Sequence, residues 1–161
     1  MIYRYWRGPL AGASVSHVWS SYASVVFLEF GQLSAGEPLP RGTLGQPRGE
    51  YCISTMQSWP HWQLSVEERI AATSDSKGAV RTAGLGLLVG RRLKTFEISV
   101  DGQSTRLRFT LGVTVRTTTE MHELRWEPHW HLFGPDRANS KEGLSVVLRG
   151  HAANPKYWSR E

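Results

Sequence analysis

The sequence predicts a mainly β protein: an antiparallel sandwich or barrel of about eight short strands, built as two related halves. Apolar residues alternate with polar ones over several stretches of strand length, and unusual residue patterns occur twice in the same order. Such alternation is typical of strands that bury one face and expose the other. We therefore expect an all-β or β-rich α+β fold whose apolar faces meet in a shared interior.

The clearest element is a hairpin around Asp101-Gly102, a dipeptide that favours a two-residue turn because both of its positions need positive φ. This turn places Phe96 opposite Leu107 on the apolar face. It also places Glu97 opposite Arg106 on the solvent-exposed face, as an opposite-charge pair. The alternation runs on to Val115, which predicts one continuous second strand.

The two halves are indicated by repeated patterns. Residues 60–64 (PHWQL) match residues 128–132 (PHWHL) at four of five positions, and a tryptophan precedes each segment. The spacing between equivalent residues falls from 78 or 79 early in the repeat to 68 late in it, so the first copy carries an insertion. Further matches, in the same order, pair Gly12, Val15 and Val18 with Gly90, Leu93 and Phe96, and Leu28 and Phe30 with Leu107 and Phe109.

The repeat predicts the organisation of the chain. Residues 1–76 would form the first β repeat, with the insertion at residues 32–50, an exposed loop with three prolines and four glycines. Residues 77–89 would be a connector and residues 90–161 the second repeat, with both halves packed as one domain. We expect the shared core to contain Trp62, Leu64, Trp130, Leu132, Phe30 and Phe109.

One segment remains open between two interpretations. Ser65 and Glu68 have the spacing of a helix capping box, but the composition of residues 65–72 suits a strand nearly as well.

Composition limits the class of protein. Seven tryptophans among 161 residues, with 40% apolar and 20% charged residues, are typical of a folded chain with a substantial core. No apolar run approaches the length of a membrane-spanning helix, and the first residues lack a signal-peptide pattern. The single cysteine, Cys52, cannot form an internal disulfide, which together with these features favours the cytoplasm.

Part of the second half resembles a known kind of domain. It has a glycine opening a hairpin, an L-x-F strand, a W-x-L strand, a Pro-Asp turn and a closing valine strand. The residues are Gly90, Leu107, Phe109, Trp130, Leu132, Pro135, Asp136 and Val146. This pattern resembles small bacterial β-rich domains, some of them found beside toxin systems. The resemblance implies that the chain binds or neutralises a partner, and it implies no catalytic residue.

The sharpest candidate for chemistry is a metal site. His129 and His131 would point to one face of a strand, and His122 and Glu120 lie near them in sequence, so a zinc ion could find three ligands. The alternative interpretation is that both histidines are solvated on the outer face, since no established ligand spacing is matched. We expect no cofactor, with zinc as the exception to test.

Other catalytic patterns are weaker. Glu120, Glu123 and Glu127 could supply an acid/base pair, although nothing sets their separation. Cys52 could be a nucleophile, but in a strand it is more typical of a small buried apolar residue. The glycine-rich residues 84–90 lack the lysine of a phosphate-binding loop.

A basic surface is the last candidate. The formal net charge is +5, and 15 of the 19 basic residues are arginines. Arg106, Arg108 and Arg116 would share one strand face, where phosphates could bind. A solvated outer face is the favoured interpretation, because the aromatic residues that single-strand binders need alternate inward here.

These observations favour a bacterial binding protein without enzymatic activity. Its partner would be another protein, and its role would be immunity-like, neutralising that partner. The partner would be met at an exposed sheet face, at residues 32–50, or at both. A small metal-dependent enzyme using His129 and His131 is the second hypothesis, and a nucleic-acid-binding sheet is the third.

Overall fold

Short antiparallel strands dominate a computed structural model that describes residues 3–6, 8, 10–21, 25–55, 61–99, 104–118, 130–134, 146–147 and 158–159. For residues 3–6, 146–147 and 158–159 it describes the backbone alone. The elements are β1 (Tyr3–Trp6), β2 (Val15–Ser20), β3 (Val26–Phe30), β4 (Tyr51–Thr55), β5 (His61–Val66), β6 (Arg69–Thr73), α1 (Gly78–Gly86), β7 (Leu93–Ser99), β8 (Ser104–Phe109), η2 (Thr110–Gly112), β9 (Val113–Thr118), β10 (Trp130–Phe133), β11 (Val146–Val147) and β12 (Trp158–Ser159).

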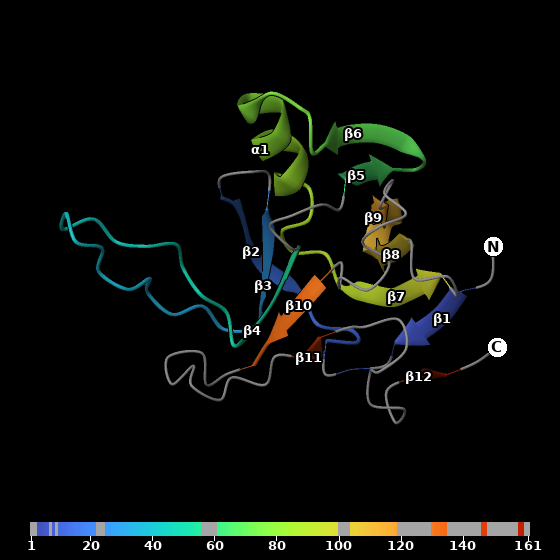
Figure 1. Cartoon of the computed structure of the whole chain (residues 1–161), viewed down its shortest axis with the longest axis horizontal. Helices are drawn as coiled ribbons and strands as arrows, with labels where there is room; N and C mark the ends of the chain where they lie inside the picture. The colour runs from blue at the N-terminus through green and yellow to red at the C-terminus, as the bar shows by residue number, and fades with distance from the viewer. Residues whose placement is uncertain are drawn as a thin grey trace.

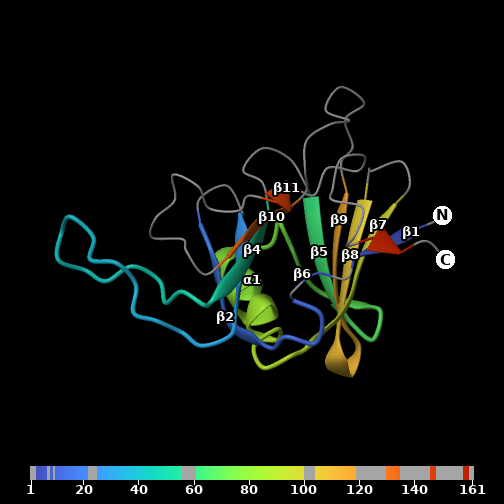
Figure 2. The same cartoon turned by 90° about the horizontal axis from the view of Figure 1, so that it is seen from below.

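The strands form two sheets that lie as separate layers (Figures 1 and 2). A seven-stranded sheet has the order β12-β1-β7-β8-β9-β5-β6, and a five-stranded sheet has the order β11-β10-β4-β3-β2. All described pairings are antiparallel. The predicted mainly β sandwich is confirmed. The described strands form two open sheets, so the barrel alternative is wrong.

Large apolar side chains fill the space between the sheets. All six residues expected in the core are buried there, with Trp62, Leu64 and Phe109 from the seven-stranded sheet and Phe30, Trp130 and Leu132 from the five-stranded sheet. Alternation puts these side chains on the inward faces, because successive residues of a strand point to opposite sides.

Trp130 also makes a polar link across this interior. Its indole N–H donates to the Thr105 hydroxyl at 2.8 Å, from the five-stranded sheet to the seven-stranded sheet. The Thr105 hydroxyl is in turn hydrogen-bonded to that of Thr117. The Phe96 ring meets the indole edge to face, with ring centroids 6.3 Å apart. The buried N–H therefore has a partner, as burial of a tryptophan in a core requires.

The expected connector carries the helix α1. It packs against β6 and β2, an edge strand of each sheet (Figure 1), and buries Leu85. Leu88, just beyond its end, is fully buried as well. A Cβ at Gly84 would lie 2.4 Å from the Ala72 Cβ, so only glycine allows helix and strand to approach this closely.

The register of the predicted hairpin is confirmed. Phe96 lies opposite Leu107, and Glu97 lies opposite Arg106. The turn residues 101–103 lie outside the described part of the chain. The solvent-exposed position expected for Glu97 is wrong, because this residue is only 2% exposed.

The single strand expected through Val115 is also wrong. The chain turns at η2 and returns as β9, so that β8 and β9 pair with each other. Leu111 and Gly112 both have positive φ, and Leu111 is 71% exposed. The alternation continues across the turn without revealing it, because Leu111 occupies an apolar place in the pattern while its side chain points into solvent.

Residues 65–72 form a strand, a turn and a second strand. Glu67 and Glu68 form the turn between β5 and β6, each with positive φ. Ser65 therefore caps no helix, and the capping-box interpretation is wrong.

The two sheets share one internal arrangement. The order β2-β3-β4-β10-β11 of one sheet matches the order β7-β8-β9-β5-β6 within the other. In this match β2, β3 and β4 correspond to β7, β8 and β9, and β10 and β11 correspond to β5 and β6. Val18 lies opposite Leu28, as Phe96 lies opposite Leu107, and these are the residues that the sequence pattern pairs. The same register shift occurs in both hairpins, just after Val15 and just after Leu93.

Each half also places its tryptophan strand in the other half's sheet. β5 from the first half pairs with β9, which sets Trp62 opposite Thr117. β10 from the second half pairs with β4, which sets Trp130 opposite Thr55. Neither sheet is completed by one half of the chain alone.

The halves meet at a reciprocal backbone junction. Gly12 donates its N–H to the Leu93 carbonyl at 2.8 Å, and Gly90 donates its N–H to the Val15 carbonyl at 2.8 Å. Both glycines have positive φ, at 77° and 79°, a conformation that other residues adopt with strain. Equivalent atoms of the two halves thus bind each other.

Substituting Thr105 tests the polar link between the sheets. In Thr105→Val the indole N–H of Trp130 loses its acceptor in the core, and we expect the free energy of unfolding to fall by about 1–3 kcal/mol. Thr105→Ser keeps the hydroxyl and should lose less. Chemical denaturation measures both. An equal loss in the two variants would contradict a role for the hydrogen bond.

Candidate functional site

The most prominent feature outside the sandwich is the segment between β3 and β4, residues 32–50, here called the arm. It projects well away from the two sheets (Figures 1 and 2). Its two sides are joined by isolated bridges, Ser34 with Arg48 and Pro38 with Leu44. Ser34 and Arg48 exchange both backbone hydrogen bonds, at 2.8 and 3.1 Å. The exposed loop predicted from the sequence is therefore a two-sided, hydrogen-bonded structure.

The base of the arm is fastened to the five-stranded sheet by a buried carboxylate. Glu29 on β3 is fully buried and accepts hydrogen bonds from the Trp19 indole N–H at 3.1 Å and the Gly49 N–H at 3.0 Å. A Cβ at Gly49 would lie 2.4 Å from the Phe30 carbonyl oxygen, so glycine lets the returning chain pass directly over β3. The Glu50 carboxylate accepts the N–H of Gln32 at 3.2 Å. Polar contacts at the base thus hold the arm in position.

The outer part of the arm combines exposed leucines with charge. Leu39 and Leu44 are 49% and 69% exposed, and Arg41 between them is exposed as well. Farther in, the Arg48 guanidinium pairs with the Glu37 carboxylate at 3.1 Å. The tip therefore presents apolar side chains and an arginine to the surroundings.

Of the predicted metal ligands, the structure describes His131. It lies on the outward face of β10, opposite Ser54, and its ring is 6.1 Å from that of Phe133. Its Nε2 is buried without a hydrogen-bond partner among the described groups, and burial lowers the pKa of this imidazole from its ordinary value of 6.5. His129, His122 and Glu120 lie outside the described residues, as do Glu123 and Glu127. The described part of the chain holds no cluster of three metal-binding side chains.

Two further sequence candidates have structural positions. Cys52 is fully buried on β4, with Glu29 and Phe133 as its cross-strand neighbours. Its thiol has no access to solvent, which a nucleophile for an external substrate would need. The glycine-rich residues 84–90 form the end of α1 and the turn after it.

The three arginines share the outward face of the seven-stranded sheet, but on two strands. Arg106 on β8 lies directly opposite Arg116 on β9, and Arg108 follows two residues along β8. The carboxylate of Glu97 forms ion pairs with Arg106 and, at 3.3 Å, with Arg108. Arg116 is exposed and makes no ion pair with any described residue.

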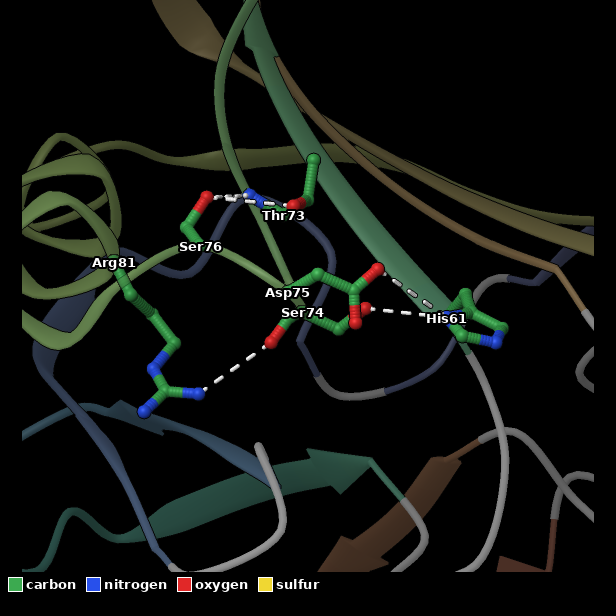
Figure 3. Close-up of polar contacts among 6 residues, drawn as sticks. All are labelled: His61, Thr73, Ser74, Asp75, Ser76 and Arg81. Atoms are coloured by element: carbon green, nitrogen blue, oxygen red, sulfur yellow. Dashed lines mark hydrogen bonds and ion pairs between the residues drawn. The ribbon is translucent and has the colours of Figure 1, made fainter.

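A further polar group, not indicated by any sequence pattern, lies at the start of β5 and beyond the end of β6 (Figure 3). The Ser74 hydroxyl lies 3.4 Å, and an Asp75 carboxylate oxygen 3.9 Å, from the same nitrogen, Nδ1 of His61. A catalytic relay needs the acid and the nucleophile on opposite ring nitrogens, whereas here both lie on Nδ1, so these three residues do not have the geometry of such a relay. The Arg81 guanidinium donates to the Ser74 carbonyl at 3.5 Å, so the group secures the turn before α1.

Comparison with protein-family models, with curated proteins and with solved structures finds no significant match for this chain. No helix in the described ranges has both the length and the apolar character needed to cross a membrane. The assignment of function therefore depends on the chain's own geometry.

The buried imidazole predicts a pH dependence of stability. With the folded-state pKa of His131 lowered, the unfolded chain binds a proton first as the pH falls below about 6.5, so the free energy of unfolding decreases until the folded-state pKa is passed. We expect His131→Gln, which introduces the residue found at the equivalent position 63, to remove this contribution. Denaturation of both proteins at about pH 7.5 and about pH 5.5 measures it. An identical change with pH in the two proteins would refute the assignment to His131.

Proposed function

We propose that this chain is a non-enzymatic binding protein that inserts the tip of the arm into an apolar pocket of a partner protein in the cytoplasm. The proposal rests on one comparison within the molecule. Between β3 and β4 the chain makes the arm, whereas the equivalent strands β8 and β9 are joined by Thr110–Gly112 alone. A three-residue turn therefore suffices to connect such strands.

We infer that the two halves descend from one duplicated unit. If they do, the β3–β4 and β8–β9 connections were once the same, and the difference between them needs a reason. The repeated motifs lie at matching registers, and Gly12 and Gly90 make reciprocal hydrogen bonds. On this view the arm is an addition to one copy of a hairpin that closes without it. An added segment that leaves Leu39 and Leu44 exposed requires ordering of its backbone without burying these side chains, so a binding role accounts for its presence.

The composition of the tip indicates the kind of partner. Leu39, which lies between Pro38 and Pro40, supplies apolar contact area with little loss of conformational entropy on binding; Leu44 adds further apolar area, and arginine is enriched in protein interfaces. A partner pocket lined by apolar side chains, with a carboxylate near its rim for Arg41, would complement this tip. The narrower proposal, that the partner is a toxin and the role immunity-like, rests on the resemblance of the second half to domains found beside toxin systems.

Shortening the arm tests the proposal. Because Ser34 and Arg48 form a hydrogen-bonded pair, residues 35–47 can be replaced by Asn-Gly, which closes such a pair as a two-residue turn. The contacts of Glu29 with Gly49 and of Glu50 with Gln32 remain, so the variant should fold. We expect affinity capture from cells of the source organism, read by mass spectrometry, to identify a protein held by the unaltered chain and lost with the short arm.

Point variants then test the tip in a direct titration with the purified partner. Leu39→Ser with Leu44→Ser should weaken binding by about 30-fold or more, the effect of losing about 2 kcal/mol at an interface hot spot. Ile70→Ser with Val80→Ser is the matched control, since these apolar residues are similarly exposed on β6 and α1. A partner held equally well by the short-arm chain, or affected equally by the control, would refute the proposal.

A further inference from the structure

The outward face of the seven-stranded sheet retains a charge arrangement that works against folding. Arg106 and Arg116 are direct cross-strand partners, and like charges in that position destabilise a sheet. On the neighbouring strand β7, the Glu97 carboxylate forms ion pairs with Arg106 and Arg108. The described side chains of this face therefore include three guanidinium groups and one carboxylate. Among the described side chains, Arg116 has no carboxylate partner.

The other sheet shows that the fold does not require these arginines. At the equivalent positions of the five-stranded sheet, Phe27 replaces Arg106, Ser54 replaces Arg116 and Glu29 replaces Arg108. Two outward faces with the same strand order thus carry different chemistry. The arginine pair belongs to the particular role of one face and not to the architecture.

The centre of this face, on the strands that carry and flank the arginines, has no apolar anchor; the exposed Ile70 lies at its edge, on β6 opposite Ser65. The outward residues of β7, β8, β9 and β5 in the described ranges are polar or charged throughout. They are Thr95, Glu97, Ser99, Ser104, Arg106, Arg108, Thr114, Arg116, Thr118, His61, Gln63 and Ser65. Protein interfaces depend on aromatic or aliphatic anchors at their centre, which these residues do not supply. A polyanion, by contrast, gains affinity from charge alone by releasing its counterions.

We propose that this face binds the phosphate backbone of single-stranded nucleic acid through Arg116, Arg106 and Arg108. The guanidinium fork matches two phosphate oxygens, and the Glu97 carboxylate orients two of the three forks before the ligand arrives. Gln63, opposite Arg116 on β5, and Thr114, opposite Arg108, add neutral donors for phosphate oxygens. Contacts of this kind hold a strand by its phosphates, without reading its bases and without the aromatic stacking that other single-strand binders add, so binding depends on charge and is independent of base sequence. This site and the arm occupy different sheets and are independent proposals.

Arg116→Glu is the decisive variant because it separates binding from stability. Glutamate opposite Arg106 turns a repulsive cross-strand pair into an attractive one, so the denaturation midpoint should stay the same or rise. Its affinity for a fluorescently labelled single-stranded oligonucleotide at low salt, measured by polarisation, should nevertheless fall on the order of tenfold or more, equivalent to about 1.4 kcal/mol. Lys77→Glu, an exposed residue at the start of α1, makes the same change in net charge and should leave the affinity nearly unaltered.

The salt dependence gives an independent measurement. Three phosphate contacts predict a slope of about −2 for log affinity against log salt, and Arg116→Gln should reduce it by about 0.7. Absence of binding at low salt, equal losses with Arg116→Glu and Lys77→Glu, or an unchanged slope in Arg116→Gln would each overturn the proposal. Polyglutamate bound as tightly as the oligonucleotide, with the same dependence on Arg116, would assign the face to acidic proteins instead and would also overturn it.

Discussion

The packing of two sheets around tryptophan is the constraint on which the remaining structure depends. Trp130 extends from the five-stranded sheet until its indole N–H reaches the Thr105 hydroxyl of the seven-stranded sheet, while its ring packs edge to face against Phe96. This contact specifies how the sheets face one another, since a buried indole N–H without a partner would be unfavourable. Because β10 also completes the sheet that begins with β2, the same residue ties the two halves of the chain together.

With the interior specified in this way, the outer surfaces are free to differ. One outward face carries Trp19 stacked on Phe27, with ring centroids 3.8 Å apart, and the base of the arm. The equivalent face of the other sheet carries the pair Arg106 and Arg116. Side chains that point outward from a strand can differ while those that point inward keep the same core, because successive residues of a strand lie on opposite faces. This accounts for two dissimilar candidate surfaces on sheets of the same strand order.

Much of the architecture was predictable from local sequence. The register of the β7–β8 hairpin follows from Asp101-Gly102, and the matching places of Trp62 and Trp130 follow from the repeated motif. The errors have physical causes. Leu111 continues the apolar alternation through a turn that positive φ creates, and the capping-box spacing of Ser65 and Glu68 coincides with another such turn. Alternation reports which faces are apolar but carries no information about where a chain reverses through rare backbone conformations.

For the candidate surfaces, too, some features were predicted from the sequence and others were shown only by the structure. The sequence by itself determined a mainly β fold with an interior rich in tryptophan, and its repeated motifs predicted an insertion at residues 32–50, because these depend on periodicity and composition. Only the tertiary structure decided that the addition is a hydrogen-bonded arm held at a buried Glu29, and that Arg106 faces Arg116 across two strands. Both depend on contacts between residues distant in sequence, which alternation along a single strand cannot specify.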